Sequence, residues 1–138
     1  MSTVFTRIIE GELPGTFVWR DEQCVAFLSI NPLSPGHTLV VPVAEIDHWL
    51  DVPADLQTHL FDVSRRIGEA QMRALRPERI GLVVAGFEVP HCHIHVCPVN
   101  SMADMNFARA LPMASAEELS GPAEAIRAEL GVSAEQTG

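Results

Sequence analysis

The sequence contains no lysine, so arginine and histidine supply all of its basic side chains. Nine arginines against eighteen acidic residues give a formal net charge of −9. Nonspecific binding to nucleic acid requires clustered positive charge, so we expect no nucleic-acid partner. A site for an anionic phosphate would have to be locally positive, through histidine protons and backbone N–H groups.

Long apolar runs and export signals are also missing. No stretch reaches the roughly 18 apolar residues of a membrane span, and the N-terminus lacks the basic-then-apolar pattern of a secretory signal. We therefore expect a cytoplasmic protein with no membrane partner. Cysteine is scarce: Cys24, Cys92 and Cys97 are odd in number and lack paired spacing, so we expect reduced, mostly buried thiols.

The length of 138 residues and a hydrophobic fraction of 47% indicate one domain with a real core. The apolar stripe of Leu56, Leu60, Val63 and Ile67 predicts a long helix that begins near residues 51–53 and ends near Leu75. The fold class that we predict is α+β, an antiparallel sheet of about five strands with one long helix and a short N-terminal helix. The remaining expected elements are a helix within residues 3–13 and strands at residues 17–20, 24–30, 38–41 and 80–84.

The end of the chain differs from the part before it. We assign residues 1–110 to the domain and residues 111–138 to a C-terminal helical extension with a flexible tail. Ser115 and Glu118 form a capping box that begins a helix, and Gly121-Pro122 should interrupt that helix. The small, polar residues 132–138 should fray.

Three histidines, His91, His93 and His95, occur at strict two-residue spacing. That is the period of a β-strand, so the three rings should emerge on one face, with alternate Cα atoms about 7 Å apart. The intervening Cys92 and Ile94, and Val96 after them, would then face the core. Pro90 and Pro98 bracket this run and suit the ends of a strand or an edge strand.

Three interpretations of this histidine row remain open. The row could be the polar outer face of an amphipathic strand, although half of the six histidines lie within five residues. It could bind a metal, because imidazole is a common ligand. It could also perform nucleophilic catalysis at phosphorus, in which one neutral ring attacks while a neighbour carries the complementary proton. Of the three remaining histidines, His48 and His59 have no neighbours in the sequence that suggest chemistry.

The segment 91–97 resembles the His-x-His-x-His motif that names the histidine triad (HIT) family. Gly86 precedes it by five residues, and residues 25–42, with His37 after Pro35-Gly36, are also similar to HIT proteins. The resemblance covers roughly residues 3–107. It implies a HIT-like fold and a nucleotide-conjugate hydrolase acting at the α-phosphate of a nucleoside phosphoramidate or a dinucleoside polyphosphate.

The resemblance also assigns roles to the four catalytic residues. It implies that His93 attacks phosphorus and forms a covalent nucleotidyl-imidazole, and that His95 hydrogen-bonds or protonates near the leaving group. His91 and His37 would orient the nucleophile. Relatives that transfer nucleotides to sugar phosphates carry glutamine at the third position, so His95 favours hydrolysis. No cofactor is required by this route, and no metal ligands are assigned.

A purine nucleotide or nucleotide conjugate is the implied partner, and the protein is expected to be a homodimer. The nucleotide-binding residues that the resemblance implies are Phe5, Ile8, Leu13, Phe27, Ser29 and Glu88. The chain departs from the family at Ser29, where relatives carry an acidic residue or asparagine, and at Phe87 and Glu88, where they carry Gln-Ser or Gln-Thr. These departures keep two alternatives open, a nucleotide-binding or interaction protein with little catalysis, and a metal-binding histidine cluster.

Overall fold

The computed structural model describes residues 2–137. Its strands form a single five-stranded sheet in the order β1-β2-β3-β5-β4, with every neighbouring pair antiparallel. The predicted fold class is confirmed. The strands are β1 (Phe17–Arg20), β2 (Cys24–Leu28), β3 (Thr38–Pro42), β4 (Arg79–Val83) and β5 (Ile94–Val99). The helices are α1 (Val4–Ile9), α2 (Ala54–Leu75), α3 (Ala116–Leu130) and α4 (Ala134–Thr137), with 3₁₀ helices η1 (Trp49–Asp51), η2 (Met102–Met105) and η3 (Phe107–Arg109).

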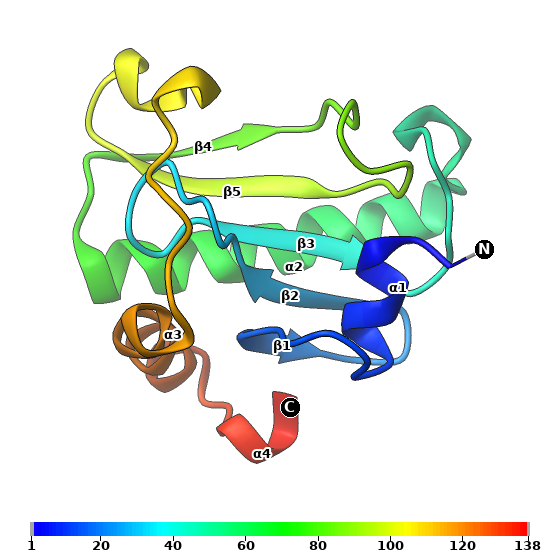
Figure 1. The fold of residues 1–138 in the computed structure, drawn as a ribbon, viewed down its shortest axis with the longest axis horizontal. Coiled ribbons are helices and arrows are strands. Elements are labelled where there is room, and N and C mark those ends of the chain that lie inside the picture. Colours follow the sequence, from blue (N-terminus) through cyan, green and yellow to red (C-terminus); the bar gives the residue numbers. More distant parts are fainter. Residues whose placement is uncertain (1, 138) are drawn as a thin grey trace.

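The sheet is covered differently on its two faces. The long helix α2 lies against one face, and the short helix α1 lies against the other near one end (Figure 1). The predicted stripe of α2 faces the sheet, since Leu60, Val63 and Ile67 are buried. Cys92, Ile94 and Val96 share that core, as the two-residue period predicted. The core on this face of the sheet also contains Val18, Cys24, Ala26, Leu28 and Val40.

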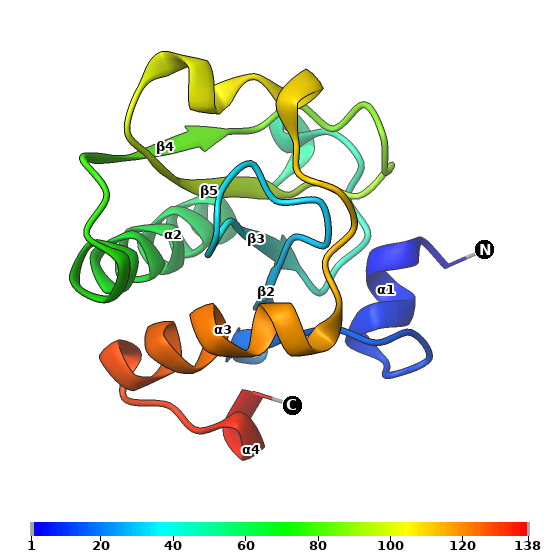
Figure 2. The same ribbon diagram turned by 60° about the vertical axis from the view of Figure 1, so that its left-hand side comes forward.

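The C-terminal segment is part of this core rather than an appendage. The capping box of Ser115 and Glu118 begins α3 as predicted, and α3 packs beside α2 (Figure 2). The expected interruption at Gly121-Pro122 was wrong, because α3 continues through Pro122. Buried residues on both sides of the proline keep the helix on the core, and Glu118, whose carbonyl loses its helical partner, is exposed to water.

The tail also differs from our expectation of fraying. Residues Ala134–Thr137 form the short helix α4 against β1. Thr137 is 1% exposed, its hydroxyl donates to the carbonyl of Phe17, and its own carbonyl accepts from Nε of Arg20 at 2.9 Å. These contacts span more than 100 residues, so local composition does not reveal them. Gly138 lies outside the described residues.

The histidine run is less regular than the spacing predicted. Strand β5 begins at Ile94, so His91 and His93 lie in the irregular segment before it. The ladder stops there because the groups that would extend it are bonded elsewhere. The N–H of Cys92 donates to the carbonyl of Ile46 at 2.7 Å, and the carbonyl of Pro42 accepts from the His91 ring.

Pro98 is not at a strand end or an edge, because it lies within β5, between β3 and β4. It is tolerated because pairing with β3 ends at Val96. Its carbonyl accepts from the hydroxyl of Ser34, in the loop before β3. The missing N–H of Pro98 therefore leaves no ladder bond unmade.

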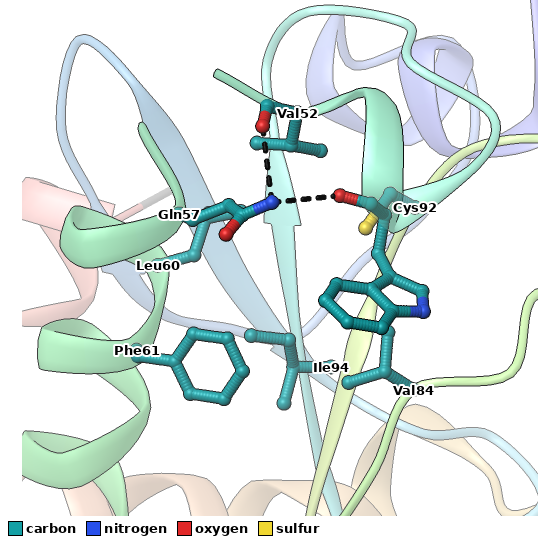
Figure 3. Close-up of a pocket in the computed structure, with 8 residues that line it drawn as sticks. Val52, Gln57, Leu60, Phe61, Val84, Cys92 and Ile94 are labelled. Atoms are coloured by element: carbon teal, nitrogen blue, oxygen red, sulfur yellow. Dashed lines mark hydrogen bonds between the residues drawn. The ribbon is translucent and has the colours of Figure 1, made fainter. Parts of the chain in front are cut away.

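The entry into α2 is tied down by a side chain. Pro53, not Asp51, is the N-cap, and Asp51 lies in η1. The amide of Gln57 donates to the carbonyls of Trp49 and Val52 at 3.0 Å each, and so joins η1 to the first turn of α2 (Figure 3). The hollow beside it has a volume of about 10 Å³, room for about one water molecule.

The cysteines agree with the expectation of reduced, buried thiols. Cys24, Cys92 and Cys97 are free and buried. Cys92 packs in the α2-face core, whereas Cys97 packs with Leu33 and Val99 in a separate cluster, so the two thiols do not bridge. No helix within residues 2–137 is both long and apolar enough to cross a membrane.

Candidate functional site

Four imidazoles form one continuous row on the sheet face opposite α2. The ring centroids of His93 and His95 are 4.9 Å apart, and those of His95 and His37 are 5.2 Å apart. His91 lies beyond His93 at the other end of the row, and His37 is brought in by the start of β3, next to β5. His91, His93 and His37 are buried, and His95 is partly buried.

The backbone fixes the protonation of the His93 ring. Its Nδ1 lies 2.8 Å from the carbonyl oxygen of His91. A carbonyl only accepts hydrogen bonds, so Nδ1 carries the proton, and in the neutral ring the lone pair is on Nε2. Nε2 has no hydrogen-bond partner within residues 2–137, and it is not one of the fully buried polar atoms that lack a partner, so it is accessible to solvent. The lone pair on Nε2 of His93 is therefore not engaged by another group of the described residues.

The neighbouring ring, His95, is held in the opposite tautomer. The backbone N–H of Leu33 donates to Nδ1 of His37 at 3.0 Å, so the proton of neutral His37 is on Nε2. That Nε2–H faces Nδ1 of His95 at 2.9 Å and must donate to it. The proton of neutral His95 is then on Nε2. Two adjacent rings thus present an acceptor, on His93, and a donor, on His95.

Burial keeps these rings neutral. It lowers the pKa of His37 to about 4 and the pKa of His95 to about 3, with additional repulsion from the neighbouring imidazoles. Burial also lowers the pKa of His93, although its bond to the His91 carbonyl and the negative charge of Glu88 oppose that shift. At neutral pH the tautomers above are therefore the relevant forms of the three rings.

The N-terminal helix supports the first ring and the apolar side of the row. The hydroxyl of Thr3 is 2.7 Å from Nδ1 of His91 and also caps α1 by accepting from the N–H of Thr6. One turn of α1 then places Phe5 edge-on to His93, with 4.9 Å between ring centroids, and 5.5 Å from Phe27. The row therefore borders an apolar cluster that contains both predicted aromatic residues.

Comparisons with known proteins agree with this geometry. A family model described as the HIT domain matches residues 10–102. The chain belongs to the HIT family.

Individual HIT proteins give the extent of the similarity. An uncharacterized HIT-like protein of Saccharolobus solfataricus is 35% identical over 100 residues, which cover 69% of this chain and 72% of that protein. The adenylylsulfatase HINT3 of Arabidopsis thaliana is 31% identical over 100 residues, 69% of this chain and 51% of that protein. The crystal structure of a Hit-like protein involved in cell-cycle regulation from Bartonella henselae matches with a TM-score of 0.82 and 26% identity, covering 93% of this chain and 96% of that one.

The other residues expected from the HIT resemblance differ in how closely they approach the histidine row. Ile8 packs at the edge of the apolar cluster around Phe5, whereas Leu13 is outside that cluster. Ser29 donates its N–H to the carbonyl of His37 at 2.9 Å. It lines a cavity of about 440 Å³ together with His37 and residues 111–114 of the segment before α3. Glu88 is exposed, and it acts on the row through its negative charge, which opposes the lowering of the His93 pKa.

Three residues that sequence reasoning missed also contact or position the row of this HIT protein. Phe107 lies edge-on to His95, with 4.8 Å between centroids, and covers the end of the row that includes His37. Thr3 binds His91 as described above. Gln71 of α2 donates to the carbonyls of Gly36 and Val96, at 2.9 and 3.0 Å, and so fixes the two strands beside His37 and His95.

No local signal marks these three residues. Thr3 is 88 residues from His91, and Phe107 lies in the short 3₁₀ helix η3, where no hydrophobic period marks its partner. Both lie outside the residues that the family model matches. Gln71 is a polar residue among apolar ones on the buried side of α2, and that exception to the helical stripe was the available clue.

Proposed function

We propose that the protein is a nucleotide-conjugate hydrolase that acts at the α-phosphate through a covalent nucleotidyl-His93 intermediate. The observation that carries this proposal is the pair of opposite tautomers, a lone pair on Nε2 of His93 beside a proton on Nε2 of His95. Displacement at phosphorus needs both a nucleophile and a proton for the leaving group.

In the first step, Nε2 of His93 attacks the α-phosphorus and a P–N bond forms. The bond from phosphorus to the leaving amine or phosphate breaks while the Nε2–H of His95 donates a hydrogen bond to the leaving atom, and any proton that the leaving group then takes up comes from water. As His93 becomes positively charged, the His91 carbonyl, which accepts its Nδ1–H at 2.8 Å, stabilises that charge.

In the second step, water attacks the nucleotidyl-imidazole. The P–N bond breaks, the proton of the water passes to solvent, and a nucleoside monophosphate leaves. His93 returns to its neutral form, with the proton on Nδ1. Because the covalent route divides one difficult displacement into two easier ones, it requires no metal or other cofactor.

A purine nucleotide fits the surroundings of the row. Phe5 and Phe27 offer an apolar surface beside His93 for a base, and Ser29 can offer one hydroxyl to a ribose. The relative from Arabidopsis thaliana is named an adenylylsulfatase, which supports an adenylyl conjugate as one member of the substrate class. The net charge of −9 also favours a small nucleotide over a nucleic-acid polymer.

The experiment is intact-protein mass spectrometry after mixing with adenosine and guanosine phosphoramidates and with dinucleoside polyphosphates, while product release is followed in parallel. We expect a nucleotidyl adduct or turnover that His93→Ala abolishes and His48→Gln leaves unchanged, because His48 is exposed and its ring accepts from the N–H of Leu50 rather than contacting the row. Turnover that survives in His93→Ala would contradict the covalent route.

A second candidate, a nucleotide-binding protein with little catalysis, is favoured by one observation. Phe87 is 96% exposed and Glu88 is also exposed, at positions where polar residues are expected from the family pattern. A carboxylate there repels a phosphate. Binding across the nucleotide panel without adduct or product would favour this candidate, and Glu88→Gln, which removes the charge, would then be the first variant to test.

We also propose that the protein forms a homodimer through the open edge of its sheet. Strand β4 has no neighbouring strand on its outer side within residues 2–137. Leu82 on β4 is 46% exposed, and Trp49 and Phe61 beside the hollow of Figure 3 are 41% and 44% exposed. Sedimentation of the wild type should give a dimer and Leu82→Arg a monomer, with Val4→Glu on exposed α1 as the control.

A further inference from the structure

A second cluster of chemically active side chains lies on the opposite face of the sheet from the histidine row. Asp21 belongs to the turn between β1 and β2, Cys24 begins β2, and His59 lies in the second turn of α2. The nitrogen, oxygen and sulfur atoms of these three side chains all lie within 4.8 Å of one another. We had expected His59 to lack such neighbours, so this grouping corrects our interpretation of that residue.

The carboxylate of Asp21 is held in one orientation. Its Oδ1 accepts from the backbone N–H groups of Gln23 and Cys24, at 2.7 and 2.9 Å. Its Oδ2 accepts from Nε1 of Trp19 at 2.7 Å, and it is the atom nearest to the other two side chains. Partners of this kind, which orient a ligand from outside, are a recurrent feature of protein metal sites.

Oδ2 of Asp21 lies at a suitable distance from the other two donor atoms for one small ion to bridge them, and these two, Nε2 of His59 and Sγ of Cys24, lie within 4.8 Å of each other. Oδ2 of Asp21 lies 2.8 Å from Nε2 of His59 and 3.7 Å from Sγ of Cys24. Metal bonds of about 2.0–2.3 Å in a tetrahedron place neighbouring ligand atoms about 3–4 Å apart. Small side-chain rotations would therefore bring all three atoms onto a common centre. Within residues 2–137 no other group of three such side chains gathers so closely, the histidine row included.

We propose that Asp21, Cys24 and His59 bind a divalent transition-metal ion of the Zn²⁺ class, with the fourth position open to water. A thiolate, an imidazole and a carboxylate together are the ligand types that favour zinc over magnesium or calcium. The side chains of Asp21 and His59 are 27% and 28% exposed, which leaves a path for the ion and for a water ligand. The ion would link the β1–β2 turn to α2.

Metal binding changes the protonation of Cys24 and His59. Coordination replaces the thiol proton of Cys24, which leaves to solvent as the Sγ–metal bond forms. The proton on Nε2 of His59 moves by way of solvent to Nδ1, so that the neutral ring binds the ion through Nε2. Each ion bound therefore releases one proton.

The test is a titration of chelator-treated protein with Co²⁺, which substitutes for Zn²⁺ and reports its ligands by absorption. The wild type should bind one equivalent and show a thiolate-to-cobalt charge-transfer band. Cys24→Ser should remove this band, whereas Cys97→Ser should keep it. His59→Gln should weaken binding by at least about tenfold, since even an orienting partner of a metal ligand typically contributes that much.

Three results would overturn the proposal. One is the absence of stoichiometric binding with a thiolate band in the wild type. Another is an unchanged titration in His59→Gln, and the third is binding that is lost in His93→Ala but kept in Cys24→Ser, which would move the ion to the histidine row. In the absence of metal binding, the three residues serve as a hydrogen-bonded link between turn and helix. Nucleotide turnover is a separate measurement, because the cluster and the row lie on opposite faces.

Discussion

The two faces of the sheet use the same strands for opposite purposes. Towards α2, successive apolar side chains from β2, β3 and β5 form a closed core, in which Ile67 and Ile94 are 0% and 2% exposed. Towards α1, His95 of β5 lies beside imidazoles from the segments just before β3 and β5, and hydrogen bonds to backbone atoms decide which ring nitrogen carries the proton. We therefore expect substitutions on the α2 face to change stability and substitutions on the histidine face to change chemistry.

His93→Ala should show the largest difference between its effect on turnover and its effect on stability. This change removes the nucleophile, so turnover should fall by about a thousandfold or more. The free energy of unfolding should change far less, because the ring makes one hydrogen bond and an edge contact. Single-turnover kinetics and urea unfolding measure the two effects on the same preparation. A variant that is strongly destabilised and yet active when folded would reverse the assignment of the two faces.

The opposite pattern is expected for Ile67→Ala on the α2 face. A fully buried branched side chain is replaced by a methyl group, which should lower the free energy of unfolding by about 2–5 kcal/mol. The turnover per folded molecule should stay near the wild-type value, since the residue contacts none of the imidazoles. Urea unfolding measures the first quantity and active-site titration with substrate the second. Met72→Ala, which shortens an exposed side chain on the same helix, is the matched control.

Substitution of one residue of α2 should change both stability and turnover. Gln71 binds the carbonyls of Gly36 and Val96 from the core side, and these lie next to the positions that carry His37 and His95. Gln71→Leu leaves two buried carbonyls without that donor, so we expect a loss of about 1–3 kcal/mol in stability and a several-fold loss in turnover. Stability loss with unchanged turnover would show that the strands hold the two rings without Gln71.

The division between the faces also explains what the sequence could predict. The two-residue period alone places Cys92, Ile94 and Val96 in the core and the histidines opposite, and the stripe of α2 identifies its buried side. The protonation of the rings could not be predicted, because it depends on single backbone atoms such as the carbonyl of His91 and the N–H of Leu33.

The start of β5 has the same kind of cause. Whether residues 91–93 join the strand is decided by bonds from the Cys92 N–H to Ile46 and from the His91 ring to Pro42, groups more than 40 residues away in the sequence. Thr3, Phe107 and the pairing of His59 with Asp21 likewise depend on the tertiary fold. Periodicity reports which face a side chain takes, and not which distant atom it finds there.

A pH titration should reveal how much stability the neutral rings require. In the unfolded chain histidine has a pKa of about 6.5, whereas burial lowers it to about 4 for His37 and about 3 for His95. Between these values the unfolded state binds protons that the folded state does not, so stability falls as the pH falls. The contribution is fully present above pH 6.5 and is lost between about pH 6.5 and 3. The free energy of unfolding, measured with urea at several pH values in this range, should fall more steeply with falling pH for the wild type than for His37→Asn. Equal pH dependence in the two proteins would contradict the prediction.

The smallest effect that we expect is a change in proton affinity at the covered end of the row. Phe107 lies 4.8 Å from His95 and shields it from water. Because burial is the main cause of the low pKa of His95, Phe107→Ala should raise that pKa towards 6.5 and move the acidic limb of kcat/KM to higher pH. Phe107→Leu keeps an apolar cover and should leave the limb near its wild-type position. Titration of the His95 ring proton by NMR follows the pKa directly, without relying on turnover. Identical titration curves in wild type and Phe107→Ala would mean that the strands, and not the segment that crosses them, keep this imidazole neutral.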